Sequence, residues 1–205
     1  MLNVYNRTKY VAELTAHLDM NTNLKKTCVY KVMNHKGDII NSSIVMILQE
    51  YIDILISHEK ELAINDNHDV KYRVKNFKCV INKITRFNRN NKLGTFPLNK
   101  VLNDILGYRL IITSTLPIKE LKLNIQETVE TLPTAMKNKI TVLNSSKNQY
   151  KAVHVYFKLS NRTYPIELQI WRAKDREQNR DSHLAYKQDY MKWHVRETEL
   201  IHQYG

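Results

Sequence analysis

The chain has 205 residues, of which 42% are hydrophobic and 25% are charged, so it has the composition of an ordinary globular protein with a core of its own. It contains no stretch long and apolar enough to cross a membrane, no start that resembles a signal peptide and no Cys/His cluster for structural zinc, and its two cysteines suit a reducing cytoplasm. With 32 Lys and Arg against 20 Asp and Glu, the net charge of +12 favours a polyanionic partner such as nucleic acid, although a solubilising charge or an acidic protein partner would also explain it. We therefore expect a single cytoplasmic domain over residues 1–205 with no membrane partner.

Residues 1–64 are predicted to form a helical N-terminal part. Apolar residues recur at helical spacing over residues 4–20, which indicates an amphipathic helix. Residues 21–38 are polar and basic, and Asn41-Ser-Ser then supplies a cap for a second helix that runs to about Ala63.

The rest of the chain alternates between strand and helix patterns. The expected elements are a strand at 70–74, a helix at 76–88, a short helix at 98–102, a strand at 107–113, a helix at 118–131, strands at 139–143, 151–159 and 163–171, and a C-terminal helix from Arg172 to about Gln203. The link at 144–150 is too short for a helical crossover, so its flanking strands should be antiparallel. This order favours an α+β fold, with a mixed and mostly antiparallel sheet flanked by helices, over a doubly wound parallel fold.

An acid and an amide interrupt the last predicted strand. Glu167 and Gln169 lie two residues apart, which places both side chains on one strand face, with Ile166, Leu168 and Ile170 on the other. Such a pair indicates either a solvated face or the lining of a site.

Two further segments deliver polar groups in the same way. Asp104 precedes the strand that carries Arg109, and Tyr150, Lys151 and His154 lead into or lie in another strand. Three strands that each deliver polar or charged groups suggest a single cleft.

These side chains have chemistry suited to a nucleotide. Asp104 and Glu167 could hold Mg²⁺ against phosphates, with ordinary surface acids as the alternative. Tyr150 could stack on a base, and His154 could donate to a phosphate or assist acid–base chemistry, with a structural hydrogen bond as the alternative.

Four basic residues accompany them: Arg73, Lys75, Lys83 and Arg109. Guanidinium planes stack on bases, and ammonium groups neutralise phosphates. A solvated helix face remains the alternative for the other basic residues of the helix at 76–88.

The motifs occur in a specific order between Lys71 and Tyr190. They are Tyr72-Arg-Val-Lys75 with Lys83 downstream, Asp104-Ile-Leu-Gly-Tyr-Arg109, Tyr150-Lys-Ala-Val-His154, Glu167-Leu-Gln-Ile170 and His183-x-x-Tyr186-Lys187. Together they resemble the synthetase domain of the RelA/SpoT family of alarmone enzymes. The resemblance implies a catalytic core over residues 65–190, closed by a C-terminal helix at 172–205, that moves the β,γ-pyrophosphate of ATP onto a ribose 3′-hydroxyl and releases AMP.

The resemblance assigns five residues to the ATP side. Asp104 would be a ligand of Mg²⁺, Arg73 and Arg109 would sandwich the adenine, and Lys75 and Lys83 would hold the phosphates.

It assigns five more residues to catalysis and to the acceptor. Glu167 would orient Mg²⁺ as a second ligand or deprotonate the 3′-hydroxyl. Tyr150 would stack on the acceptor base, and His154, Lys151 and Gln169 would contact the acceptor.

Departures from the family pattern bear on the acceptor. Gln149 replaces the usual Gly before the loop tyrosine, Trp171 follows the Gln motif, and the last motif keeps His183 without its usual Trp and Glu. In these changes and in its net charge of +12, the sequence resembles the toxic small alarmone synthetases of toxin–antitoxin pairs. Those enzymes place pyrophosphate on the 3′ CCA end of tRNA and stop translation, which implies a tRNA acceptor end and a separate antitoxin protein as partners.

Two alternatives remain open: a small alarmone synthetase that acts on GDP or GTP, and a catalytically dead relative that binds RNA.

Basic residues near both ends of the chain are candidates for contacts to the tRNA backbone, with a solvated surface as the alternative. These candidates are Lys25, Lys26, Lys31, Arg172, Lys174, Arg176 and Arg180.

Overall fold

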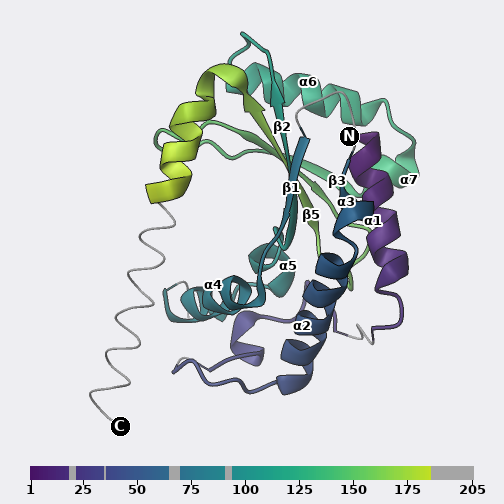
Figure 1. Cartoon of the computed structure of the whole chain (residues 1–205), viewed down its shortest axis with the longest axis vertical. Coiled ribbons are helices and arrows are strands. Elements are labelled where there is room, and N and C mark those ends of the chain that lie inside the picture. Colours follow the sequence, from purple (N-terminus) through teal and green to yellow (C-terminus); the bar gives the residue numbers. More distant parts are fainter. Residues whose placement is uncertain (19–21, 35, 65–69, 91–93, 186–205) are drawn as a thin grey trace.

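The computed structural model describes residues 1–18, 22–34, 36–64, 70–90 and 94–185. Over these residues the protein has an α+β fold, with helices flanking a mixed five-stranded sheet, as the sequence predicts (Figure 1).

The sheet has the strand order β1-β2-β5-β4-β3. Its strands are β1 (Val70–Val74), β2 (Leu106–Ile112), β3 (Ile140–Asn144), β4 (Val153–Phe157) and β5 (Ile166–Arg172). Only β2 and β5 pair in parallel, whereas the other three pairings are antiparallel. The expected antiparallel pairing across the 144–150 link is confirmed.

Helices surround the sheet. They are α1 (Leu2–Leu14), α2 (Ser42–Ser57), α3 (Glu59–Leu62), α4 (Phe77–Asn90), α5 (Leu98–Val101), α6 (Ile118–Glu130), α7 (Thr134–Lys137) and a helix over residues 176–185, with 3₁₀ turns at Val29–Lys31 and Ala173–Asp175. The predicted continuation of the last helix beyond residue 185 lies outside the described residues, as do Tyr186 and Lys187 of the last motif.

Two predicted helices end earlier than expected. The first ends at Leu14, because Thr15 leaves helical geometry and its hydroxyl donates to the Val11 carbonyl at 2.8 Å. The second does not run unbroken to Ala63: it divides into α2 and α3 at His58, whose backbone leaves helical geometry.

The two faces of the sheet differ in polarity. Tyr108, Leu168 and Val155 are register partners on the apolar face, and all three are almost fully buried. Helices α1 and α6 lie on this side of the sheet, and the Tyr108 hydroxyl donates to the Leu62 carbonyl of α3 at 2.8 Å (Figure 1). The main core therefore occupies one side and leaves the other face for polar side chains.

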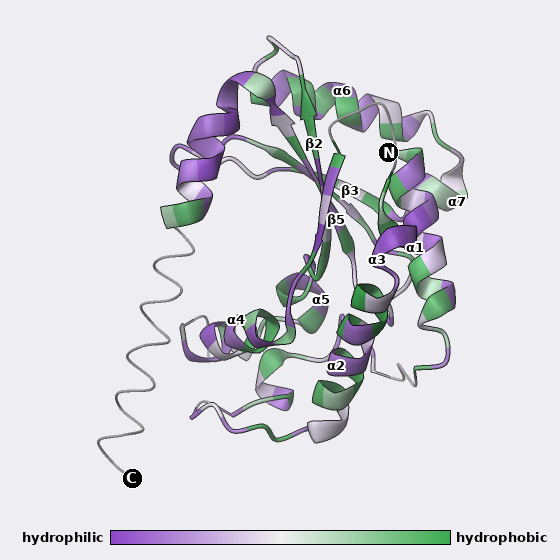
Figure 2. Cartoon of the chain, viewed as in Figure 1, coloured by the Kyte–Doolittle hydropathy of each residue, from purple (hydrophilic) through white to green (hydrophobic). Residues whose placement is uncertain are grey.

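The helix over residues 176–185, drawn in yellow in Figure 1, lies on the opposite side of the sheet from α1. It is mostly hydrophilic (Figure 2), and Asp175 and Asn179 are buried at its base. Within the part of the chain that the structure describes, none of the helices has the length and apolar character needed to span a bilayer.

Candidate active site

Two cross-strand rows of residues form the polar face of the sheet. One row joins Lys71, Arg109, Gln169 and His154, and the next joins Arg73, Gly107, Glu167 and Tyr156. Each row crosses β1, β2, β5 and β4, and residues that are register partners in a sheet share a face. The register therefore brings together motifs that lie up to about a hundred residues apart in the chain.

A cavity of about 330 Å³ opens on this face. It is lined by residues of β1, β2 and β5, and by Arg180, His183 and Leu184 of the C-terminal helix. Gly107 keeps part of it open, because a Cβ there would already lie 3.7 Å from the Glu167 carboxylate.

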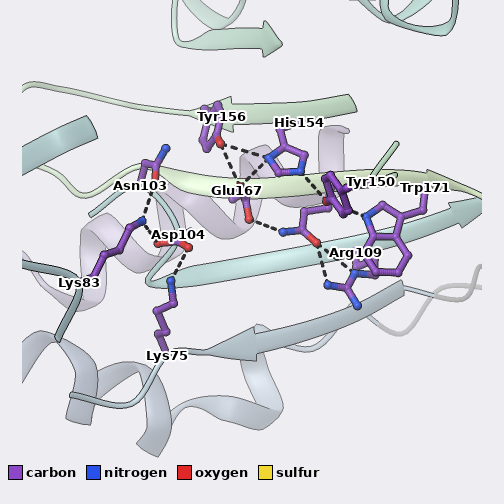
Figure 3. Close-up of polar contacts among 11 residues, drawn as sticks. Lys75, Lys83, Asn103, Asp104, Arg109, Tyr150, His154, Tyr156, Glu167 and Trp171 are labelled. Carbon is purple, nitrogen blue, oxygen red and sulfur yellow. Dashed lines mark hydrogen bonds and ion pairs between the residues drawn. The ribbon is translucent and has the colours of Figure 1, made fainter. Parts of the chain in front are cut away.

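Glu167 lies at the centre of a hydrogen-bond network (Figure 3). Its Oε1 contacts His154 Nδ1 at 2.9 Å and accepts from the Tyr156 hydroxyl at 3.0 Å, and its Oε2 accepts from Gln169 Nε2 at 2.8 Å. Burial alone would raise the pKa of Glu167, but the contacts to His154 and Gln169 outweigh it and hold the pKa below its usual value. The group is therefore a carboxylate at neutral pH.

Contacts through Tyr150 and His154 link the indole of Trp171 to Glu167. The Trp171 indole N–H, which can only donate, points at the Tyr150 hydroxyl oxygen at 3.1 Å. The Tyr150 hydroxyl in turn lies 2.8 Å from His154 Nε2, and the Glu167 carboxylate, which can only accept, meets His154 Nδ1, so Nδ1 carries a proton that faces Glu167. Burial raises the pKa of Tyr150 to about 12, which keeps this hydroxyl protonated at neutral pH.

Arg109 is held on two sides. Its Nε and Nη2 donate to Gln169 Oε1 at 3.1 and 2.8 Å, and its Cζ lies 3.6 Å from the centroid of the Trp171 ring. Such a stacked guanidinium gains from the cation–π attraction. Arg73, the other predicted adenine contact, lines the same cavity.

These contacts close a ring of side chains, which we call the polar ring (Figure 3). In order, its members are Arg109, Gln169, Glu167, His154, Tyr150 and Trp171, which returns to Arg109.

A second cluster, the lysine–aspartate cluster, lies at the start of β2. Lys83 Nζ is 2.8 Å from Asp104 Oδ1, Lys75 Nζ contacts Oδ2, and Asn103 accepts from Lys83 at 3.4 Å (Figure 3). Burial would raise the pKa of Asp104, but the two ammonium groups outweigh it and keep the pKa well below its usual range. Burial lowers the pKa of Lys75, and the neighbouring Asp104 carboxylate opposes that shift.

Asn179 anchors the loop that carries Tyr150. Its Oδ1 accepts from the Lys151 N–H at 2.8 Å, and its Nδ2 donates to the Lys151 carbonyl at 2.9 Å. One helical turn later, the His183 ring lies 5.6 Å from the Tyr150 ring and 5.9 Å from the Trp171 ring. The C-terminal helix therefore packs against the tyrosine, whose ring is surrounded by His154, Trp171 and His183.

The predicted tRNA contacts fall in separate places. Lys25, Lys26 and Lys31 are exposed in the N-terminal segment, at the opposite end of the molecule from the C-terminal helix (Figure 1). At the C-terminal helix and the turn before it, Lys174 and Arg180 are exposed, and Arg176 is half-buried. Only Arg180 of the predicted set lines the cavity.

Arg172 requires a correction. Its side chain is buried, forms an ion pair with Asp175 and donates to the Leu116 carbonyl at 2.7 Å. A guanidinium held in this way fixes the end of β5 to the loop before α6, so it is not a surface contact for a nucleic-acid backbone.

The residues present fit a magnesium ion. Among the described residues no group of three or more His, Cys, Asp and Glu side chains is arranged to hold a metal. However, Mg²⁺ is usually held by one or two carboxylates together with substrate phosphates. Asp104, between two lysines, and Glu167, whose pKa the charge of Asp104 raises, are the carboxylates that would hold the ion, with phosphates taking the place of their present partners.

Residues 72–191 match the family described as the region found in RelA / SpoT proteins, which is more than half of the chain. The chain belongs to the RelA/SpoT family. The prediction of an ATP-dependent pyrophosphotransferase is thereby confirmed at the level of the enzyme class. No curated protein matches this RelA/SpoT chain.

Solved structures of the small alarmone synthetase 1 from Bacillus subtilis are similar to this RelA/SpoT chain. The synthetase bound to its product pppGpp is 17% identical, with a TM-score of 0.33 over 78% of this chain and 94% of the synthetase. A second structure of the synthetase is 18% identical, with a TM-score of 0.38 over 76% of this chain and 81% of the synthetase. The synthetase bound to AMPCPP is 17% identical, with a TM-score of 0.36 over the same shares.

Three site residues were not predicted from the sequence. Tyr156 and Trp171 lie two positions after His154 and Gln169, so strand alternation carried a signal for both. Asn179 lies on a helix outside the strand motifs, and only its position four residues before His183 places the two on one helix face.

Proposed function

We propose that this protein transfers the β,γ-pyrophosphate of ATP to the 3′-hydroxyl of the tRNA CCA end and thereby stops translation, as the cytoplasmic toxin of a pair with a separate antitoxin protein. The observation that carries the transfer chemistry is that four members of the polar ring line the cavity, while Asp104 of the lysine–aspartate cluster is close enough for its charge to act on Glu167. A new bond forms between the 3′-oxygen and the β-phosphorus, the bond from the β-phosphorus to the α-phosphate oxygen breaks, and AMP leaves.

The ATP side of this proposal rests on Arg73, Arg109, Lys75 and Lys83. Adenine would stack on Arg109, and the two ammonium groups would neutralise phosphate charge that water solvates in free ATP. Asp104 and Glu167 would hold Mg²⁺, which would supply positive charge to the phosphates. Pyrophosphoryl transfer depends on this positioning and charge stabilisation.

The lowered pKa of Glu167 supports an orienting role over a proton-abstracting role. A general base works best with a pKa near the working pH, whereas the contacts to His154 and Gln169 hold the pKa of this carboxylate below its usual value. We propose that Glu167 aligns Mg²⁺ or the acceptor hydroxyl, and that the acceptor proton leaves with the transfer.

The net charge of +12 and the basic residues beside the cavity support a tRNA acceptor. Arg180 lines the cavity and Arg176 lies one turn earlier on the same helix. A phosphate backbone could lie along this helix with its 3′ end in the cavity, where Tyr150, His154, Lys151 and Gln169 would meet the terminal nucleotide.

The second candidate function is synthesis of (p)ppGpp from GDP or GTP, because the ATP side of the site would serve either acceptor. Labelled γ-phosphate ATP, incubated with deacylated tRNA in one tube and with GDP and GTP in another, separates the two. We expect label on tRNA alone, with an Asp104→Asn variant as the blank. Label on the guanine nucleotide alone would establish the alternative, and label on neither would overturn both.

A further inference from the structure

Trp171 contacts both predicted substrate sites through different parts of its indole. The face of its ring lies on Arg109, the predicted adenine contact, at 3.6 Å. Its N–H donates to the hydroxyl of Tyr150, the predicted acceptor contact, at 3.1 Å. The side chain is almost fully buried, so neither contact can be replaced by water without unpacking the strand end.

The stacked indole restricts how Arg109 binds a base. A guanidinium has two faces, and Trp171 covers one of them. A purine that stacks on Arg109 must therefore meet the remaining face. The double hydrogen bond from Arg109 to Gln169 fixes the plane of the guanidinium, so that face has a single orientation.

Trp171 also fixes the position of the Tyr150 hydroxyl, which begins a chain of polar contacts. The indole N–H donates to the Tyr150 oxygen, that hydroxyl contacts His154 Nε2, and the His154 Nδ1 proton faces the Glu167 carboxylate, which can only accept. Removal of the N–H would free the Tyr150 hydroxyl to rotate and would loosen this chain.

We propose that Trp171 is a positioning residue that couples the two substrate sites, so that a base stacked on Arg109 and an acceptor at Tyr150 strengthen each other's binding. The coupling passes through one rigid side chain held in β5 and through the closed contacts of the polar ring. This inference rests on the proposed roles of Arg109 and Tyr150, but it holds for either acceptor.

The test separates the two contacts of Trp171. Trp171→Phe keeps an aromatic ring for Arg109 and removes the N–H, whereas Tyr150→Phe keeps the tyrosine ring and removes the hydroxyl. The dissociation constant of a non-hydrolysable ATP analogue with Mg²⁺ is measured with and without a saturating acceptor, for both variants and the double variant. Deacylated tRNA and GDP are each used as the acceptor.

For the wild type, we expect the productive acceptor to tighten binding of the ATP analogue by about fivefold, a typical size for coupling between sites. Without acceptor, Trp171→Phe should bind the analogue within about twofold of the wild type, because its ring still covers Arg109. With acceptor, each single variant should lose the tightening, and the double variant should lose no more than either alone, because both remove the same contact.

Two results would overturn the inference: wild-type coupling that persists in Trp171→Phe, or losses that multiply in the double variant. If Trp171→Phe does not fold, Tyr150→Phe alone decides, since it deletes only an oxygen. The proposed function fails separately, if the wild type labels neither acceptor from ATP. A wild type that labels an acceptor but shows no coupling refutes the role of Trp171 and leaves the proposed function standing.

Discussion

Glu167 is buried in the lining of the cavity and Asp104 is half-buried just before β2, and the structure holds the two carboxylates in different ways. Asp104 lies between two ammonium groups, those of Lys75 and Lys83. Glu167 is held by His154 and by side chains of Tyr156 and Gln169 that carry no charge at neutral pH. The first arrangement is a cluster of charges on flexible stems, and the second is a set of directional hydrogen bonds within a sheet.

This difference indicates a division of labour. Ammonium groups have no fixed donor plane, so phosphates can take the place of a carboxylate beside them without rearranging the backbone. Hydrogen bonds between sheet residues have fixed directions, and the polar ring closes on itself through Trp171. We therefore propose that the lysine–aspartate cluster serves the phosphates and the metal, and that the polar ring aligns the two reacting nucleotides.

The largest effect should come from Asp104→Asn. We expect a fall in pyrophosphate transfer of about 100-fold to 1,000-fold, since the substitution removes one of the two carboxylates proposed to hold Mg²⁺ and leaves two half-buried lysines facing a neutral amide. Initial rates of label transfer at saturating ATP measure it.

Asp53→Asn is the matched control, because Asp53 is an exposed acid on α2 whose carboxylate contacts only the neighbouring Gln49 among the described contacts. It should leave the rate unchanged. Full activity in Asp104→Asn would remove the metal and phosphate role from the cluster, and activity absent from the wild type too would favour the RNA-binding relative without catalysis.

A smaller effect is expected at Gly107, which tests whether the cavity beside the polar ring holds substrate. An alanine Cβ would lie 3.7 Å from the Glu167 carboxylate, an ordinary contact, so Gly107→Ala should change the rate by less than about twofold. The two methyl groups of Gly107→Val would enter the cavity and should reduce transfer by about tenfold or more, with little change in melting temperature. Equal rates in both variants would place the substrate elsewhere.

Sequence patterns predict which residues lie on the polar face better than they predict the strand order and the side-chain contacts that join those residues. Period-two spacing placed Glu167 and Gln169 together, and the motif order pointed to Arg109 and Tyr150. The neighbours of β5 could not be read from spacing, because strand order depends on packing between distant segments. Trp171 resembles a core aromatic in a strand pattern, and only the structure shows that its N–H meets a hydroxyl.

The surface residues and helix ends were the least predictable parts. The sequence pattern does not distinguish Arg172 from the exposed basic residues near it, although Asp175 three positions later holds it in the interior. The short helix α7 is about one turn long, so it leaves no measurable periodicity.

A several-fold effect is expected on the acceptor side alone. Arg176→Gln combined with Arg180→Gln should reduce tRNA labelling by about threefold to tenfold. The same double variant should also make tRNA binding less dependent on salt, by the equivalent of up to about two lost phosphate contacts. Lys25→Gln with Lys26→Gln, at the far end of the molecule, is the comparison and should have less effect. GDP labelling should be unchanged in both, and a larger loss in the lysine variant would move the tRNA path away from the C-terminal helix.

The smallest effect concerns acid stability. The folded-state pKa values of Asp104 and Glu167 lie below their usual values, so both carboxylates stabilise the fold above about pH 4 and lose this contribution as the pH falls through their folded-state pKa values. Asp104→Asn should therefore show a shallower loss of unfolding free energy than the wild type between about pH 5 and about pH 3. Urea titrations at each pH measure it, and parallel slopes would mean that the ion pairs contribute nothing to stability.

The most direct measurement of the division of labour compares Tyr150→Ala with Lys83→Met for two quantities, the dissociation constant of Mg-ATP without acceptor and the rate of tRNA labelling. We predict that Tyr150→Ala binds ATP within about twofold of the wild type and loses labelling, because Arg109 keeps its stack on Trp171. Lys83→Met should weaken ATP binding by about tenfold, because a phosphate loses its ammonium partner. Equal losses of ATP binding in the two variants would contradict the separation of the polar ring from the lysine–aspartate cluster.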